Sequence, residues 1–290
     1  MKERPALSSC TVGIYGLGLM GGSFASALKR RVPHCTILGV DIRESAVAWG
    51  LDNGIIDRGS ADAALLREAE FIVLATPVGE IKRWLTVDAG SLDEGTVILD
   101  LGSTKKEIVD IMEKLPETLN ALGGHPMAGK ETSGIESSDA EMFSGAPFFL
   151  VPTSRLPATV CDEISALVSS MGAKPVVIDA STHDRIAAAS SHVPYLASVC
   201  LTLAIEELSQ KEELCSTFMA SGFRDTSRLA ACLPSMTVPM CTSNRANVMR
   251  QLKILVKKAE GILQMLVDGD DERLMKECER ARDIRKVLIP

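Results

Sequence analysis

The chain has 290 residues, of which 46% are hydrophobic and 24% charged, and its formal net charge is -7. This composition is that of a folded protein with room for two medium-sized domains, and it excludes an intrinsically disordered chain. The acidic balance provides no general positive field, so we expect no nucleic-acid partner and no anionic membrane surface; an anionic substrate needs arginine or lysine at the site itself.

The first elements predict a dinucleotide-binding turn. Thr11–Tyr15 is a short apolar run typical of a buried strand, and three glycines follow at Gly-x-Gly-x-x-Gly spacing before a predicted helix over Ser23–Arg30. The first glycine permits a tight turn, the second lets backbone approach a pyrophosphate, and the third lets the helix pack close to the strand. The predicted cofactor contacts in this turn are Gly16, Leu17, Gly18, Met20 and Gly21.

The next predicted strand, Thr36–Val40, indicates which dinucleotide binds. It ends at Asp41, twenty positions beyond Gly21, where a carboxylate accepts hydrogen bonds from an adenosine ribose. Because Asp41 would repel a 2′-phosphate, it favours NAD. Arg43 offers a partner for that phosphate, so NADP is the alternative.

Helices and strands alternate through the rest of the N-terminal part, which predicts an α/β Rossmann-type domain over residues 1–180. Ligands of such domains lie at the carboxyl ends of the strands, so Thr76 and Pro77 are expected to border the cofactor. The predicted helices are Arg43–Leu51, Val78–Val87, Lys105–Leu115 and Pro157–Met171, and the predicted strands are Phe71–Ala75, Thr96–Leu99, Phe148–Val151 and Lys174–Ile178.

Two polar residues follow predicted strands of this domain. Ser103 comes after Thr96–Leu99 and just before the helix Lys105–Leu115, where it also suits the N-cap of that helix. His125 stands between a glycine and a proline, in a predicted loop after a strand, and this place suits chemistry better than packing.

From Ser181 onward the pattern is helical. Asp184–Leu208 and Ala246–Val267 carry apolar residues at helical spacing, and Asp270–Leu288 is charged enough to be an exposed helix with ion pairs. We expect an all-α domain over residues 181–290. Its wide apolar faces predict pairing with a second copy, hence a homodimer.

The cysteine pattern and the N-terminal sequence indicate the cellular compartment of the protein. The eight cysteines form no Cys-x-x-Cys pair and lie near no histidines at metal-ligand spacing, so we expect reduced thiols and no metal. The N-terminus lacks the apolar segment of a signal peptide, and no run of about 18 uncharged apolar residues occurs. These features predict a cytoplasmic protein.

Hydride removal from an alcohol needs a base, and histidine titrates nearest the working pH. His34 lies on the wrong edge of the predicted sheet, and His183 is placed at a helix start, where a structural role suffices. His125 and His192 remain. On a largely apolar helix face, however, a lone histidine such as His192 is more often a hydrogen-bonded core residue.

Seven segments together resemble one family: GLGLMGGS, LATPVGEI, DLGSTK, GGHPMAGKETSG, SSHVPYLAS, SGFRDTSRLA and CTSNR. They occur in the order and spacing of the prephenate/arogenate dehydrogenases, the TyrA-type enzymes of tyrosine biosynthesis. The resemblance covers nearly the whole chain, and its fourth and sixth motifs are specific to this group. It implies a minimal member without a chorismate mutase or regulatory domain.

The resemblance implies the oxidative decarboxylation of a cyclohexadienol, either prephenate or arogenate, with hydride transfer to NAD. His125 takes the hydroxyl proton, and carbon dioxide leaves as the ring becomes aromatic. Ser103 corresponds to the serine that orients the hydroxyl and its base beside the nicotinamide. The aromaticity gained drives the reaction, so positioning is the enzyme's main task.

The resemblance also implies how the substrate is held. Arg228 matches the arginine that binds a carboxylate; a surface ion pair with a neighbour such as Asp225 is the alternative. Glu131 and Arg224 match a pair that gates the site, in one arrangement across the dimer. The remaining implied contacts are Lys130 and His192.

Two positions depart from the family pattern. Tyr195 stands where many members have a histidine, which leaves the choice between prephenate and arogenate open. Thr237 stands where many carry a tryptophan, so packing or inhibitor binding there is expected to differ.

The sequence leaves two alternative functions open. A β-hydroxyacid dehydrogenase or a pyrroline-carboxylate-type reductase joins similar domains, but the former should carry a catalytic lysine on the first long helix of its second domain. Asp184–Leu208 contains no lysine. The second alternative is a non-enzymatic NAD-binding sensor, which the joint presence of His125, Ser103 and Arg228 disfavours.

Overall fold

The computed structural model of the chain describes residues 10–32, 34–130 and 132–289. These residues form two compact units, which divide after Asn244. The first unit holds a sheet and the helices around it, and the second holds the last two helices. Each unit is described by itself below.

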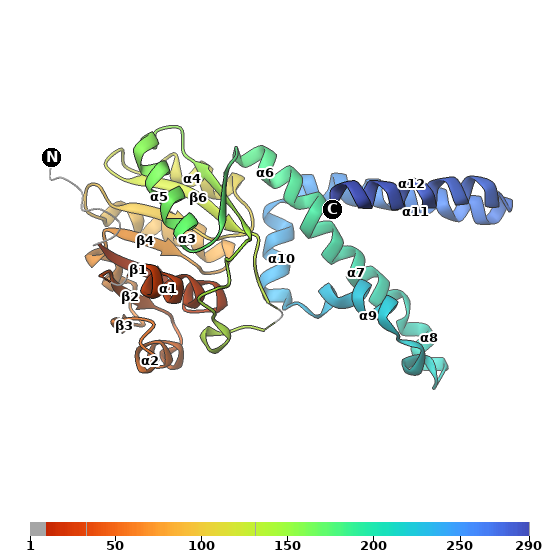
Figure 1. The fold of residues 1–290 in the computed structure, drawn as a ribbon, viewed down its shortest axis with the longest axis horizontal. Helices are drawn as coiled ribbons and strands as arrows, with labels where there is room; N and C mark the ends of the chain where they lie inside the picture. The colour runs from red at the N-terminus through yellow and green to blue at the C-terminus, as the bar shows by residue number, and fades with distance from the viewer. Residues whose placement is uncertain (1–9, 33, 131, 290) are drawn as a thin grey trace. The chain divides into compact units, whose positions relative to one another are not determined.

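The first unit is built on one eight-stranded sheet with the order β3-β2-β1-β4-β5-β6-β7-β8 (Figure 1). Neighbouring strands are parallel, except that β6 and β7 run antiparallel. The predicted α/β fold is thereby confirmed, since every predicted strand is present. The strands are β1 (Thr11–Tyr15), β2 (Thr36–Val40), β3 (Arg58–Ser60), β4 (Phe71–Leu74), β5 (Val97–Asp100), β6 (Asn120–Pro126), β7 (Pro147–Pro152) and β8 (Lys174–Val177).

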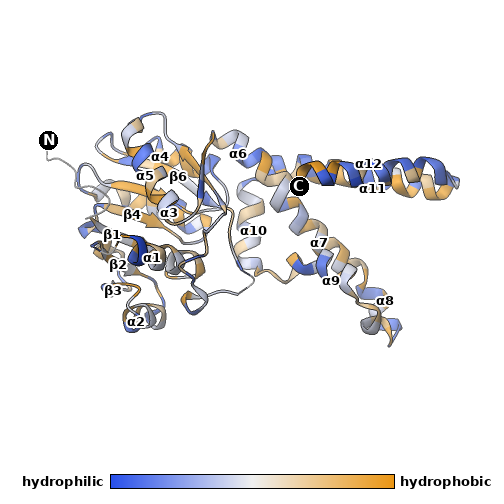
Figure 2. Ribbon diagram, viewed as in Figure 1, coloured by the Kyte–Doolittle hydropathy of each residue, from blue (hydrophilic) through white to orange (hydrophobic). Residues whose placement is uncertain are grey.

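Five helices supply the two hydrophobic clusters that cover the sheet. Side chains of α1, α2 and α5 are in one cluster and side chains of α3 and α4 are in the other. Figure 2 shows the central strands as the apolar layer between them. Such burial on both faces explains why β1 and β4 are apolar at nearly every position. The helices are α1 (Leu19–Arg31), α2 (Glu44–Asp52), α3 (Val78–Val87), α4 (Lys106–Met112) and α5 (Ala158–Ser170).

Two local predictions are corrected, and one strand was not predicted. Helix α1 begins at Leu19 rather than Ser23, so the last glycine of the motif lies inside its first turn. Strand β3 was not predicted, because its three residues, RGS, carry no apolar pattern. His125 lies within β6 and not in a loop, because β7 pairs with β6 as far as Pro126.

After the last strand the first unit continues as helices. The predicted helix Asp184–Leu208 begins four residues earlier and is interrupted by a π-helical turn, Ala188–His192. The stretch Ala180–Lys211 is long enough to span a membrane, and an 18-residue window within it has a mean hydropathy of 1.4, with 33% of that window buried. The helical elements are α6 (Ala180–Ala187), α7 (Val193–Ala204), α8 (Glu206–Lys211), η6 (Cys215–Phe218), α9 (Ser221–Ser227), η7 (Arg228–Ala231) and α10 (Pro234–Ser243).

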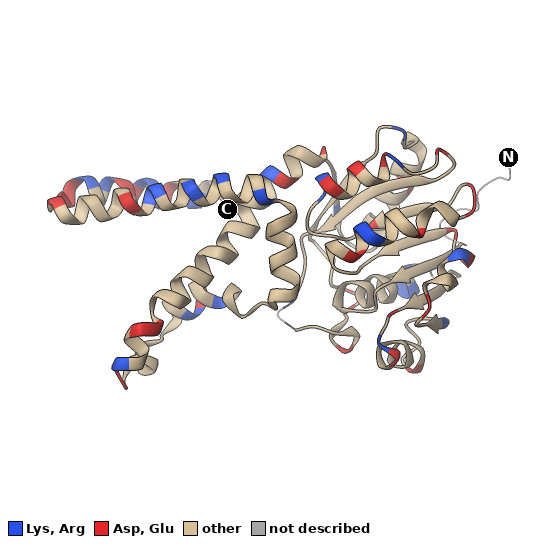
Figure 3. Ribbon diagram, turned by 180° about the vertical axis from the view of Figure 1, so that it is seen from behind, with Lys and Arg blue, Asp and Glu red and all other residues tan. Residues whose placement is uncertain are grey.

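The second unit consists of α11 (Arg245–Asp268) and α12 (Asp271–Leu288), which contact each other. Charges of both signs crowd these helices, whereas α7 carries few (Figure 3). The predicted ion pairs are present on α12, for example between Lys276 and Glu272 at 2.6 Å. Helix α11 also leaves large apolar side chains exposed, including Leu263 at 61% and Val267 at 71%.

One ion pair lies fully inside the first unit, between the ends of β5 and β6. The Nζ of Lys105 contacts Asp100 and donates to the carbonyl oxygen of Gly124 at 2.6 Å. Asp100 also accepts from the N–H groups of Gly102 and Gly124. Burial raises the pKa of Asp100 and lowers that of Lys105, because each charged form has lost its water. The pair ties the residue before His125 to the end of β5.

We expect Lys105→Met to lower the free energy of unfolding by about 3–5 kcal/mol, because it leaves the Asp100 carboxylate buried without its cation. The matched control is Lys106→Met, one position along, which removes an exposed ion pair with Asp110. It should lower the free energy of unfolding by about 0.5 kcal/mol or less. Urea unfolding followed by circular dichroism measures both. Equal losses in the two variants would show that the buried pair contributes nothing special.

Candidate active site

The turn after β1 has the shape that a pyrophosphate requires. Gly16 has a φ of +100°, and a Cβ there would lie 2.8 Å from the Thr76 side chain. A Cβ on Gly21 would lie 1.9 Å from the carbonyl oxygen of Gly16, whereas one on Gly18 would meet nothing within 4 Å. The chain thus turns tightly, packs closely at Gly21, and leaves space over Gly18 where α1 begins. Backbone N–H groups at a helix start bind phosphates well.

Asp41 supports this turn from the end of β2. Its Oδ2 accepts from the N–H of Leu17 at 2.8 Å, and its Oδ1 accepts from the N–H and Nε of Arg43 at 2.9 and 3.2 Å. Arg43 also donates to the carbonyl oxygen of Leu17 at 3.2 Å. The hydrogen bond of Arg43 to Asp41 raises the pKa of Arg43. The two residues that were predicted to select the cofactor, Asp41 and Arg43, therefore both lie at the cofactor turn and are paired with each other.

The other predicted cofactor residues lie at the same edge of the sheet. Thr76 and Pro77 follow β4, and Pro77 occupies the N-cap of α3. The Thr76 hydroxyl is buried and has no hydrogen-bond partner among the described residues. Ser103 follows β5, between β4 and β6 in the sheet. Since β1, β4 and β5 are parallel, their ends form one ligand-binding edge.

His125 is the polar side chain at the end of the next strand, β6. It is 9% exposed and lies opposite Phe149 of β7 in the strand register. Its Nδ1 lies 2.8 Å from Nε2 of His183. Burial lowers the pKa of His125 well below its usual value, and the nearby His183, Lys105 and His192 act in the same direction. A neutral imidazole of this kind can accept a proton.

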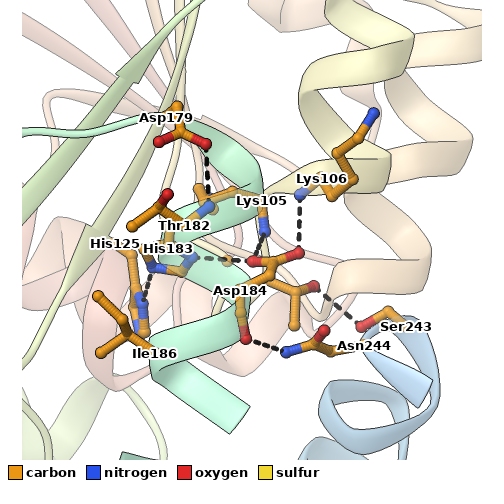
Figure 4. Close-up of polar contacts among 12 residues, drawn as sticks. Lys105, Lys106, His125, Asp179, Thr182, His183, Asp184, Ile186, Ser243 and Asn244 are labelled. Carbon is orange, nitrogen blue, oxygen red and sulfur yellow. Dashed lines mark hydrogen bonds and ion pairs between the residues drawn. The ribbon is translucent and has the colours of Figure 1, made fainter. Parts of the chain in front are cut away.

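His183 and Asp184 of α6 extend this contact into a chain of hydrogen bonds (Figure 4). Nδ1 of His183 lies 2.8 Å from Oδ1 of Asp184. The Asp184 carboxylate also accepts from the N–H groups of Lys105 and Lys106, at 2.7 and 2.9 Å. Burial alone would raise the pKa of Asp184, but these hydrogen bonds lower it below its ordinary value.

This arrangement corrects one expectation about Ser103. The N-cap position of α4 is Lys105, and no side chain caps the helix from there. Asp184, far along the chain, supplies the acceptor that the first amides of α4 need. Ser103 is therefore not required as a cap.

His192 lies at the end of the π-helical turn and is fully buried. Its Nδ1 lies 3.4 Å from Nδ2 of Asn244, which also donates to the carbonyl oxygen of Asp184 at 2.6 Å. Its Nε2 has no partner among the described residues. A buried imidazole nitrogen without a partner is a candidate contact for a ligand, and π-helical turns are frequent at functional sites.

The remaining predicted substrate residues are not part of the hydrogen-bonded group that contains His125, His183 and Asp184. Lys130 is exposed and pairs with Asp139 at 3.0 Å. Arg224 and Arg228 are exposed on α9 and η7, both of which pack against α7. Tyr195 is buried on α7. Glu131, the predicted partner of Arg224, lies outside the described residues.

Sequence reasoning missed His183 and Asp184 as parts of the site. A histidine and an aspartate in the first turns of a helix are ordinary, and nothing local indicates that they reach a strand and another helix. His34, by contrast, is exposed as expected.

Comparison with known proteins identifies similar chains over nearly the full length. Residues 24–177 match the family "Prephenate dehydrogenase, nucleotide-binding domain", and residues 179–279 match "Prephenate dehydrogenase, dimerization domain". The prephenate dehydrogenase of Bacillus subtilis is 29% identical over 281 residues, which cover 96% of this chain and 76% of the relative.

Two solved structures share the fold closely. One is prephenate dehydrogenase from A. aeolicus in complex with hydroxyphenyl propionate and NAD+; its TM-score is 0.90 at 27% identity, covering 98% of this chain and 100% of that one. The other is Synechocystis arogenate dehydrogenase, with a TM-score of 0.81 at 26% identity, covering 96% of this chain and 100% of that one.

The buried histidines should make stability depend on pH. Burial lowers the pKa of His192 to about 4, so between pH 6.5 and 4 the unfolded chain binds a proton that the folded chain does not. We therefore expect the free energy of unfolding to fall as pH decreases through this window, by up to about 1.4 kcal/mol per pH unit for this group. The matched variant His192→Asn keeps an amide near the position of Nδ1 and should show a shallower fall in urea titrations. Identical slopes would contradict the assignment.

Proposed function

The chain belongs to the prephenate dehydrogenase family, and from this premise we propose that it oxidatively decarboxylates prephenate, using NAD, in tyrosine biosynthesis. Arogenate, which carries an amino group on the side chain, is the second candidate substrate. The observation that supports this function most directly is the burial of His125, which lowers its pKa, beside the edge of the sheet where the cofactor turn lies.

His125 acts as the general base in this proposal. Its Nδ1 is engaged by His183, and the described residues place no hydrogen-bond partner on Nε2. Nε2 accepts the proton of the ring hydroxyl; the C–H bond at the same carbon breaks as hydride leaves, and the carboxylate on the opposite ring carbon departs as carbon dioxide. The ring thereby becomes aromatic, so the residues mainly have to hold the reacting groups in line.

The residues present fit NAD. The open space over Gly18, the start of α1 and the carboxylate of Asp41 suit a pyrophosphate and an unphosphorylated ribose. When bound, NAD supplies the nicotinamide that accepts the hydride. Ser103, which follows β5 between the cofactor turn and β6 in the sheet order, is the residue proposed to orient the hydroxyl and its base.

Arg228 is the proposed partner of a substrate carboxylate, because a guanidinium grips a carboxylate with two parallel hydrogen bonds. The ring hydroxyl of the substrate then faces His125. His192 offers a further hydrogen-bond donor to the substrate. Lys130, Arg224, Glu131 and Tyr195 remain proposed contacts, with Tyr195 helping to set the choice between prephenate and arogenate.

We further propose that the protein is a homodimer. The C-terminal match is to a dimerization domain, and helices within that match expose large apolar side chains. Covering these side chains by a second copy would account for their exposure and for the apolar stretch Ala180–Lys211. A cytoplasmic location stays a prediction.

Purified protein is expected to form NADH, followed at its absorbance, when supplied with NAD and prephenate or arogenate. His125→Asn should lower turnover about a hundredfold or more and leave NAD affinity nearly intact, because a general base is lost. The control is His34→Asn, which changes an exposed histidine of the same domain. Unchanged turnover in His125→Asn would sink the assignment of the base, and absence of turnover in the unaltered protein would sink the function.

Arg228→Ala should raise the KM for the carboxylate substrate about ten- to a hundredfold, because a hydrogen bond to a charged group is lost. Arg228→Lys should fall between, since an ammonium keeps the charge but not the paired geometry. Arg67→Ala, which removes an exposed arginine of η2 (Ala63–Glu68), is the control. If Arg228→Ala changed the melting temperature alone, a structural role would replace the proposed one.

A further inference from the structure

The hydrogen bonds around His125 determine which of its nitrogens carries a proton. Asp184 accepts from two backbone N–H groups and has a lowered pKa, so it is ionised and can only accept. Nδ1 of His183, 2.8 Å from Asp184, must therefore be the donor in that contact.

A neutral imidazole with its proton on Nδ1 has an acceptor at Nε2. Nε2 of His183 lies 2.8 Å from Nδ1 of His125, so with this tautomer of His183 it is Nδ1 of His125 that donates. The lone pair of His125 is then on Nε2, the nitrogen to which the described residues give no hydrogen-bond partner.

Packing holds the ring of His183 in this orientation. It meets Phe149 edge to face at 5.6 Å and His125 at 5.0 Å between ring centroids. Phe149 is paired with His125 across β6 and β7, so the surfaces that contact His183 come from neighbouring strands. His183 and Asp184 are 3% and 1% exposed, which keeps competing water away from both contacts.

We propose that His183 is a positioning residue: anchored by Asp184, it fixes His125 as the tautomer with the proton on Nδ1 and the lone pair on Nε2. This rests on the proposed function, in which Nε2 of His125 is the base. After proton transfer, the imidazolium of His125 still donates from Nδ1 to His183, and the nearby charge of Asp184 stabilises it. Asp184 itself stays ionised throughout.

Two substitutions of His183 separate positioning from structure. In His183→Asn the side-chain amide can occupy the place of Nδ1 and donate to Asp184, but nothing replaces Nε2. In His183→Gln the longer side chain can offer its oxygen at the place of Nε2 and accept from His125, while the contact with Asp184 is lost.

We expect His183→Asn to keep the melting temperature but to lower kcat, with little change in KM. The loss should lie between about tenfold and the 10⁴-fold that a wrongly held catalytic histidine can cost. His183→Gln should retain most of kcat, even where its melting temperature falls. The reverse order, with His183→Gln the slower enzyme and His183→Asn near normal, would overturn the proposal in favour of a structural role.

Nitrogen NMR of protein with labelled histidines tests the tautomers without substrate. The chain has four histidines, so their ring nitrogens can be assigned from single substitutions. We expect His125 and His183 each to carry a proton on Nδ1 at pH 7, with Nε2 of His183 as the acceptor for His125. A His125 protonated on Nε2, or a doubly protonated His183, would overturn the inference.

The two readouts also separate this inference from the proposed function. The expected tautomers in a protein that turns over neither prephenate nor arogenate would refute the function and leave the arrangement standing. Turnover by a protein whose His125 carries its proton on Nε2 would refute the positioning role alone.

Discussion

A carboxylate taken out of water must be surrounded by donors, and Asp184 meets this requirement from two directions. The first amides of α4 donate to it from one side and the ring of His183 from the other. Helix α6 is thereby fixed to the start of α4, and through His183 to His125 on β6. Because an uncompensated buried charge is costly, these three elements are held together as a set.

The reversal of strand direction at β7 gives His125 its surroundings. The parallel strands β1, β4 and β5 end at one edge, which suits a dinucleotide, and β6 ends beside them. On its parallel side, β6 is paired with β5 only as far as Gly123. The antiparallel β7 instead runs alongside His125 and places Phe149 opposite it, so the base is buried next to the cofactor edge. In such a place electrostatic interactions are stronger than in water.

Local signals in the sequence were sufficient for most of the fold and for the cofactor turn. The glycine spacing, the apolar strands and the position of Asp41 each reflect constraints within about thirty residues, and the structure has them as predicted. The strand that continues through His125 could not be predicted in the same way, since its last pairs depend on β7. The role of Asp184 at α4 is likewise a contact between distant segments, for which Ser103 was the plausible local substitute.

The substrate-binding residues could not be predicted from local sequence patterns. Arg224 and Arg228 are exposed on α9 and η7, and their proposed roles depend on the substrate or on a second copy of the chain. Glu131 lies outside the described residues. Motif resemblance suggested all three, because no periodicity or spacing within one chain distinguishes a carboxylate-binding arginine from a surface one. His183 is the opposite case: the sequence suggested only a structural role, and its contacts with His125 and Asp184 are seen only in the structure.

The central claim, that a buried neutral His125 is the base, is tested most directly by the pH dependence of kcat/KM, which reports the free enzyme. Initial rates are measured from pH 5 to 9 with the rate of an enzyme-free blank subtracted. Since burial lowers the pKa of His125, the account predicts that kcat/KM stays level down to pH 6.5 and falls only below it. An acid limb with its midpoint above 6.5 would contradict the account, because the base would then be a group whose charged form the site favours.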